Sequence, residues 1–255
     1  MQSNPRQAEL PRTRWRLVDV RQCLSWLAGK CLTSVSRILR RLGFSRKQAQ
    51  AFVRSPDPNY ASKRWAIVRA YAQLCAQPDQ VRLVFLDEVT YLRQPSLAPA
   101  YHPAGPTQPR AQHLARPNTQ TRVLATLDAQ TGQVVYLQRN RITLATFVGF
   151  CAQLRAAYPH LPTLYVVLDN WPLHTHPRAR AALDQHHLTP LFLPTYASWL
   201  NPIEKLWRWL RQDVLHLHPY ATDLDHLRKL VGNFLDQFAG SSPALLHYVG
   251  LPVDQ

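Results

Sequence analysis

Hydrophobic side chains in the first third of the chain recur every three to four residues, the spacing of an amphipathic helix. The pattern predicts two short helices, over about 17–27 and 34–42, with Gly29 between them and Gly43 at the end. The expected cap of the second helix is Thr33 or Ser34. The apolar positions are Leu17, Val20, Leu24, Leu27, Val35, Ile38, Leu39 and Leu42.

Three arginines of the second predicted helix fall off its apolar stripe: Arg37, Arg40 and Arg41. Two short helices, a turn containing glycine and an arginine-lined second helix are typical of a helix-turn-helix. Many helical hairpins with charged outer faces share this pattern. Ser45 is expected to cap a third short helix, and residues 55–58 resemble a linker. Residues 60–77 predict another amphipathic helix, whose face carries Trp65, Val68, Tyr71 and Leu74.

After Pro78 the pattern changes to short apolar runs of the strand type. Strands are expected at 81–86, 122–127, 133–138, 164–168 and 190–193, with a hairpin turn at 128–132. Helices are expected at 143–158, 177–187 and 202–215, and an irregular excursion at 94–118. This order predicts an α/β fold, a mixed sheet with flanking helices, preceded by a small all-α region.

The charge is concentrated at the N-terminal end. The chain has 30 Lys and Arg against 15 Asp and Glu, a net charge of +15, and residues 1–80 hold 15 of the basic side chains and 4 of the acidic ones. Such a local excess favours a polyanionic partner, most commonly nucleic acid. The alternative is a set of solvated arginine faces in a generally basic proteome.

Several classes of protein are excluded. The first 30 residues lack the apolar core of a signal peptide, and no run approaches the ~18 apolar residues of a membrane span. The four cysteines form no CxxC pair, so a disulfide scaffold or structural zinc site is not expected. There is no GxxxxGK[ST] or GxGxxG loop. We expect a soluble intracellular protein with no membrane partner.

Three acidic residues stand in strongly apolar surroundings. Asp87 and Asp169 end predicted strands, and Glu204 lies in the first turn of the last predicted helix. Carboxylates at the carboxyl ends of central strands project into the crevice where α/β sheets bind ligands. Three convergent carboxylates suit a pair of Mg²⁺ ions, which could promote cleavage of a phosphodiester.

Each of these residues also has a structural interpretation. An Asp after a strand is often a turn former, and Glu204 is favoured by the helix dipole whatever the function. Glu88 follows Asp87 directly and should point to the other face of the strand, in a structural or supporting role. His174 and His176 resemble a ligand pair, but the neighbouring prolines favour loop histidines.

The segments around these acids carry a family resemblance. They read Phe85-Leu-Asp-Glu88, Val167-Leu-Asp-Asn-Trp-Pro-Leu-His174 and Leu193-Pro-Thr-Tyr-Ala-Ser-Trp-Leu-Asn-Pro-Ile-Glu-Lys-Leu-Trp207. They resemble the DDE transposases of bacterial insertion sequences, mariner-type branch. The 34 residues between Asp169 and Glu204 match the spacing of that branch. The resemblance covers residues 81–250, and the helix-turn-helix fits the DNA-binding region of the family.

The resemblance implies a ribonuclease H-like catalytic domain over 59–255, after a helix-turn-helix and linker over 1–58. It implies Mg²⁺ or Mn²⁺ ions, two in number, held by Asp87, Asp169 and Glu204. Supporting roles fall to Asn170, His174 and Asn201. The expected DNA-binding side chains are Arg37, Arg40, Arg41, Arg46 and Lys47.

Enzymes of this family hydrolyse DNA at transposon ends and then join the freed 3′-hydroxyl to target DNA, usually at TA. The implied partners are double-stranded DNA, as terminal inverted repeats and as target, and a second copy of the chain in a homodimer. The implied location is the nucleoid of a prokaryotic cytoplasm. Family members commonly carry two N-terminal helix-turn-helix units, and one is recognisable here. The alternatives are a catalytically silent DNA-binding remnant or repressor, and a ribonuclease H-like nuclease without strand transfer.

Overall fold

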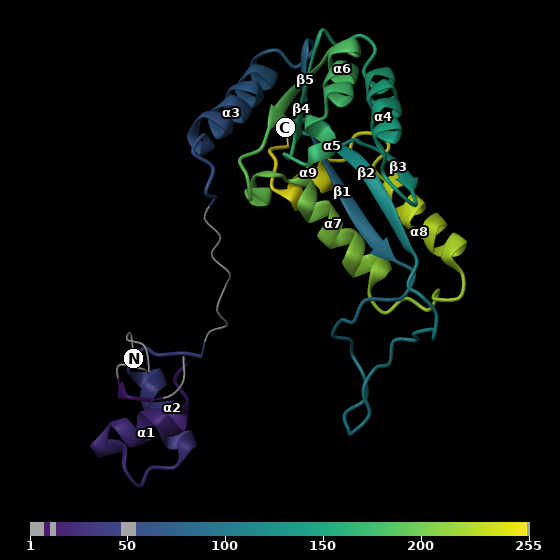
Figure 1. Ribbon diagram of the computed structural model, residues 1–255. Helices are drawn as coiled ribbons and strands as arrows, with labels where there is room; N and C mark the ends of the chain where they lie inside the picture. The colour runs from purple at the N-terminus through teal and green to yellow at the C-terminus, as the bar shows by residue number, and fades with distance from the viewer. Residues whose placement is uncertain (1–7, 11–13, 47–54, 254–255) are drawn as a thin grey trace. The chain divides into compact units, whose positions relative to one another are not determined.

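The computed structural model describes residues 8–10, 14–46 and 55–253, and the chain divides into two compact units, Met1–Phe52 and Val53–Gln255 (Figure 1). The smaller unit contains helix α1 (Leu17–Cys23), a 3₁₀ turn (Ser25–Leu27) and helix α2 (Leu32–Arg41). Its buried side chains are Val20, Leu27, Val35 and Leu39. The predicted pair of helices is therefore confirmed.

The cap of α2 differs from the prediction. The helix begins at Leu32, and the N-cap is Cys31 rather than Thr33 or Ser34. Ser34 lies in the first turn instead, where its hydroxyl contacts the Cys31 sulfur at 3.2 Å. Gly29 and Gly43 both have positive φ angles, as turns around this helix require. The helix expected after Ser45 extends into 47–54, outside the described residues.

The larger unit is built on one mixed sheet of five strands in the order β3-β2-β1-β4-β5 (Figure 1). β1 pairs antiparallel with β2, and β2 with β3, whereas β4 and β5 run parallel to β1. The strands are β1 (Val81–Leu92), β2 (Gln120–Asp128), β3 (Val134–Arg139), β4 (Thr163–Leu168) and β5 (Leu188–Phe192). The predicted mixed sheet is confirmed.

Helices cover both faces of this sheet (Figure 1). One face packs against α4 (Leu144–Ala157) and α6 (Pro177–Gln185), with the short α5 (Pro172–Thr175) before α6. The other packs against α3 (Tyr60–Ala76), α7 (Ile203–Leu210), α8 (Leu224–Asp236) and α9 (Pro243–Val249). A short 3₁₀ turn (Ser198–Leu200) precedes α7, and a π-helical turn (Arg211–Leu215) follows it. Among the described helices, none is long and apolar enough to span a membrane.

Four elements depart from the sequence pattern. β1 is twice as long as predicted, because its pairing with β2 continues to Leu92 after its pairing with β4 ends at Phe85. Helix α3 buries Ala70 and Leu74 but leaves Trp65 and Val68 exposed, so the predicted apolar face is rotated. Two helices, α8 and α9, have no counterpart among the predicted elements.

The segment expected to be a linker makes specific contacts within the larger unit. The Ser55 hydroxyl donates to the Thr195 carbonyl at 2.6 Å, and the Thr195 amide donates to Asp57 Oδ2 at 2.9 Å. Lys63 pairs with the same carboxylate at 2.8 Å. Together these bonds hold the pKa of Asp57 well below its usual range, and the Lys63 hydrogen bond contributes most. Residues 55–57 therefore lie against the loop after β5.

Candidate active site

The three predicted carboxylates come from elements that the sheet brings together. Asp87 lies two residues beyond Phe85, where β1 last pairs with β4, and Asp169 lies two residues beyond its partner Val167. The two aspartates therefore occupy equivalent positions on neighbouring parallel strands. Glu204 lies in the first turn of α7, which packs on β1. The candidate site lies where the pairing of β1 with β4 has ended and its pairing with β2 continues.

Asp87 is largely buried and faces α7. The indole Nε1 of Trp207 donates to Asp87 Oδ2 at 2.9 Å. Burial, followed by the negative charges of Glu204 and Glu88, raises the pKa of Asp87 to about 7. The direction of this change shows that Asp87 shares a poorly solvated region with two other carboxylates.

Glu88 and Asp169 are joined through one histidine. His174 Nδ1 lies 2.8 Å from Asp169 Oδ1, and His174 Nε2 lies 3.0 Å from Glu88 Oε1. The Trp171 amide also donates to Asp169 Oδ1, at 3.0 Å. As expected from strand alternation, Glu88 points to the face opposite Asp87. The histidine bridge fixes the orientation of the Asp169 carboxylate from that opposite face.

His174 is not a loop histidine, and that interpretation of the sequence was wrong. It lies in the short helix α5, is fully buried, and packs with its ring centroid 5.0 Å from that of Phe147 and 5.4 Å from that of Trp171. Burial alone would lower its pKa, but the hydrogen bonds it donates to Asp169 and Glu88, together with their negative charges, raise it to about 9. His176, by contrast, is exposed and caps α6.

The same network acts on Asp169, whose side chain is about half exposed. Desolvation by itself would raise its pKa, but the hydrogen bonds from His174 and from the Trp171 amide outweigh that effect. The net pKa of Asp169 is therefore below its ordinary value. The pKa of Asp87 in β1 is therefore raised, and the pKa of Asp169, just after β4, is lowered, because their surroundings differ.

Two asparagines connect the loops that carry these acids. Asn201 is buried and donates through Nδ2 to the Leu86 carbonyl at 3.1 Å, which links the start of α7 to the residue before Asp87. Asn170 donates to the Leu193 carbonyl at 2.7 Å, linking the ends of β4 and β5. Lys63 Nζ lies 3.5 Å from Asn170 Oδ1. Both asparagines position backbone next to the carboxylates.

Sequence reasoning missed one participant in this site and one contact between residues to which it had given supporting roles. Trp207 is buried one helical turn after Glu204, and its indole donates a hydrogen bond to Asp87. The spacing of three between Glu204 and Trp207 was the available signal, because such residues share a helix face. The Glu88–His174 contact spans 86 positions in sequence and had no local signal.

The donor chemistry of the site fits a divalent cation, since hard carboxylate oxygens are the ligands that Mg²⁺ and Mn²⁺ prefer. The raised pKa of Asp87 also favours a cation at this site, because a positive charge would relieve the repulsion from Glu204 and Glu88. Within 8–10, 14–46 and 55–253, no three His, Cys, Asp or Glu side chains are already gathered tightly enough to ligate a metal.

The predicted DNA-binding arginines lie in the smaller unit. Arg37, Arg40, Arg41 and Arg46 are all exposed there. The first three project from α2, away from the side that buries Val35 and Leu39. Lys47 lies outside the described residues.

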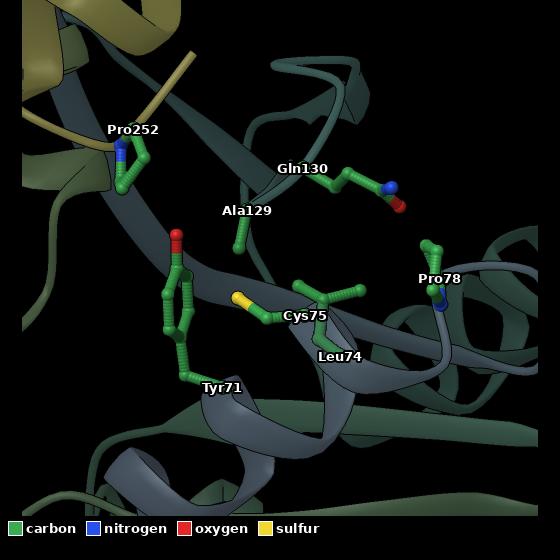
Figure 2. A pocket seen from close by; sticks show the side chains of 7 residues that line it. All are labelled: Tyr71, Leu74, Cys75, Pro78, Ala129, Gln130 and Pro252. Carbon is green, nitrogen blue, oxygen red and sulfur yellow. The ribbon is translucent and has the colours of Figure 1, made fainter. Parts of the chain in front are cut away.

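A separate cavity of about 240 Å³ lies at the other end of the sheet (Figure 2). Tyr71 and Cys75 project into it from α3, and Ala129 and Gln130 border it from the turn after β2. The Ala129 amide donates to the Leu83 carbonyl, near the start of β1 and away from Asp87. None of its seven lining side chains is charged, so the cavity is not part of the carboxylate site.

Comparisons with known proteins agree with this geometry. The family model described as "DDE superfamily endonuclease" matches residues 82–228. The insertion element IS630 uncharacterized 39 kDa protein of Shigella sonnei is 23% identical over 228 residues, 88% of this chain and 65% of that protein. The chain thus spans slightly less than two thirds of the length of that relative.

Two solved structures have a similar fold. The Mos1 transposase paired-end complex with left transposon end gives a TM-score of 0.64 at 17% identity, covering 95% of this chain and 76% of that one. The Mos1 mariner paired end complex with Mn gives 0.64 at 15% identity, covering 94% and 76%. The ribonuclease H-like fold is therefore confirmed. Because the family model covers more than half of the sequence and includes all three carboxylates, the chain belongs to the DDE superfamily endonucleases.

Proposed function

We propose that this protein is a transposase, which hydrolyses DNA strands at transposon ends and joins the freed 3′-hydroxyl to target DNA, at TA sites. The observation that supports the proposal is the position of Asp87 and Asp169, each two residues beyond the last paired residues of β1 and β4, with Glu204 near enough to help raise the pKa of Asp87 to about 7. A structural role for Asp87 would not require the repulsion from Glu204 and Glu88, which costs stability.

Asp87, Asp169 and Glu204 would hold the metal. Two Mg²⁺ or Mn²⁺ ions, when bound, supply activation of the attacking oxygen and stabilisation of the leaving one. Both hydrogen bonds to Asp169 reach Oδ1, which leaves Oδ2 for a ligand. That the similar Mos1 mariner structure contains Mn supports this choice of ion.

Neighbouring side chains orient the carboxylates for this work. Trp207 fixes one oxygen of Asp87, and His174, itself held by Glu88, fixes one oxygen of Asp169. Asn201 ties α7 to the residue before Asp87 and so sets the distance between Glu204 and Asp87. Such positioning matters because small displacements of catalytic groups cost large factors in rate.

The DNA partner follows from charge and from the smaller unit. Arg37, Arg40, Arg41 and Arg46 give this unit an exposed basic surface for phosphate contacts, and Lys47 adds a further charge in the sequence. A Mos1 structure similar to this chain is a paired-end complex with a transposon end. We therefore propose terminal inverted repeats and target duplex as substrates, a homodimer that pairs two ends, and a division of labour between residues 1–58 and 59–255.

The test uses the flanking DNA of the gene as an end-labelled duplex. Wild type, Asp169→Asn and the control Asp184→Asn, which changes an exposed carboxylate of α6, are incubated with it in Mg²⁺ or in chelator. Cuts at the repeat boundary that need Mg²⁺ and Asp169 but not Asp184 are expected. Cutting that survives Asp169→Asn or chelation would refute the assignment.

A second arm separates transposition from the alternatives. The cut fragment is supplied with supercoiled target plasmid, and joined products are sequenced. Joining at TA supports the transposase. Cutting without joining would indicate a nuclease, and binding without cutting would indicate a remnant that occupies the ends.

A further inference from the structure

A second group of charged side chains lies at the end of the sheet beyond Glu88. Arg122 in β2 is directly opposite Arg139 in β3, and Thr90 in β1 is directly opposite Arg122. Alternation along the strands puts these three side chains on the same face as Glu88. Arg141 follows two residues after the end of β3. We call Arg122, Arg139 and Arg141 the basic row.

The basic row is electrostatically uncompensated. In the described part of the chain, none of its three guanidinium groups has a carboxylate within salt-bridge distance, and the half-buried Arg122 has an Nε atom without a hydrogen-bond partner. Like charges placed directly opposite each other on neighbouring strands destabilise a sheet. An arrangement that costs stability and contacts no acid is best explained by an anion supplied from outside.

A hollow of about 430 Å³ lies beside Arg139 and Arg141, which line it together with Thr121, Gln138, Asn140 and Arg228. Thr121 and Gln138 belong to the face of the sheet opposite Arg122, so Arg122 does not line this hollow. Arg228 does not need an external anion, because it donates to Asp225 at 3.0 Å, to Thr121 at 3.3 Å and to Asn140. It therefore forms a fixed wall. Arg139 and Arg141 are exposed at the rim, and Arg139 donates through Nη1 to the Gln138 carbonyl at 2.7 Å.

The row is close to the proposed catalytic carboxylates. Arg122 is the diagonal cross-strand neighbour of Glu88. The Cα atoms of such neighbours are typically about 7–8 Å apart. Glu88 is bound to His174, and His174 to Asp169. The row thus lies on the Glu88 face of the sheet, opposite Asp87, and reaches the candidate site only through Glu88 and His174. A polymer that carries regularly spaced negative charges could reach all three arginines, whereas a single small anion could not.

We propose that Arg122, Arg139 and Arg141 bind the phosphodiester backbone of duplex DNA beside the carboxylate site. The position of this DNA next to the reacting phosphate rests on the proposed function, whereas the binding of phosphates does not. The arginines would contact backbone and not bases, so this site adds affinity and register without sequence preference.

The test measures the salt dependence of binding to a non-specific duplex, in chelator, with the full chain. The triple variant Arg122→Gln, Arg139→Gln, Arg141→Gln is compared with wild type and with a control of equal charge, Arg64→Gln, Arg69→Gln, Arg178→Gln, whose positions are exposed on α3 and α6. For every phosphate that an arginine no longer neutralises, the slope of log K against log salt becomes shallower by about 0.9. The basic-row variant should therefore have a slope shallower than wild type by roughly two to three units, and the control should change much less.

Thermal melting of the same variants separates binding from a structural role. Removing facing like charges should leave the melting temperature unchanged or raise it. A basic-row variant that melts at a lower temperature than wild type while keeping the wild-type salt slope would overturn the inference. Equal salt slopes for the basic-row variant and the control would also overturn it. Equal slopes are the result expected if the true partner of the row is an acidic protein. Because no cleavage is needed, a wild type that fails to cut transposon ends would refute the proposed function and leave this comparison intact.

Discussion

Replacing Asp87 by Asn should stabilise the metal-free protein while abolishing cleavage. The carboxylate of Asp87 is held among Glu204 and Glu88, and burial with these charges raises its pKa from 3.8 to about 7. Asn is uncharged and keeps an oxygen that can accept the hydrogen bond from Trp207. The substitution therefore removes the repulsion and retains the contact.

The magnitude follows from the shift in pKa. A difference of about three units, at about 1.4 kcal/mol per unit, gives an upper limit of roughly 4 kcal/mol at pH values above 7. Rearrangement of neighbouring side chains and entry of water would reduce this to about 2 kcal/mol. For a unit of this size, 1 kcal/mol shifts the melting temperature by about 2–4 °C, so a rise of roughly 4–8 °C is expected.

The dependence on pH has a definite sign. An acid whose pKa is raised by folding destabilises the folded state once the unfolded chain begins to ionise, near pH 4, and the cost reaches its full value above pH 7. The advantage of Asp87→Asn should therefore be small near pH 4, grow between pH 4 and pH 7, and stay constant above.

Differential scanning calorimetry in chelator, at pH 5, 6, 7 and 8, is the assay. Asp184→Asn serves as the control and should melt like wild type at every pH, because Asp184 is exposed. Adding Mn²⁺ should then raise the melting temperature of wild type more than that of Asp87→Asn. An Asp87→Asn protein that melts at or below the wild-type temperature at pH 8, or whose advantage does not grow with pH, would refute this account of the site.

Four further results are expected. Glu88→Gln should slow cleavage more than tenfold but leave DNA affinity unchanged, because Glu88 acts through His174; equal loss of affinity in a filter-binding assay would contradict this. Asn201→Ala should lower the free energy of unfolding by about 1–3 kcal/mol in urea titrations, since it removes a buried bond to Leu86; no change would show that the link is dispensable. Replacing Arg37, Arg40 and Arg41 by Gln should weaken DNA binding and flatten its salt dependence, and an unchanged slope would remove α2 from the DNA interface. Ca²⁺ in place of Mg²⁺ should permit binding but stop cleavage, and equal turnover in gel assays would argue against a Mg²⁺-specific geometry.

The sequence predicted the sheet well because its strands are short, apolar and separated by strong turn signals. The hairpin between β2 and β3 is an example: Gly132 has the positive φ that its turn requires. The length of β1 was not predicted, because Asp87 and Glu88 interrupt its apolar run, and the strand conformation of residues 89–92 depends on pairing with β2. The local sequence pattern of β1 contains no information about its pairing with β2.

Helix α3 shows a second limit. Trp65 and Val68 fit a helical stripe with Tyr71 and Leu74, but the side that meets the sheet is centred on Ala70 and Leu74. Tertiary packing decided which of two overlapping stripes was buried. The prediction of a loop at His174 was wrong for a related reason. The neighbouring prolines favour a loop, but Pro172 is the first residue of the short helix α5, in which His174 is buried.

The sequence could propose residues for the candidate site but not the energetics that the structure gives them, and the reason lies in β1. On one side of this strand the pairing with β4 stops at Phe85, and on the other the pairing with β2 continues to Leu92. Asp87 therefore stands on a rigid strand beside an opening into which Asp169 and α7 project. A rigid support and an open flank are both needed if acids are to be held close together against their repulsion, and Trp207 and Asn201 supply the bonds that keep α7 there. The same continuation of β1 carries Thr90 alongside Arg122, so one strand connects the carboxylates to the basic row.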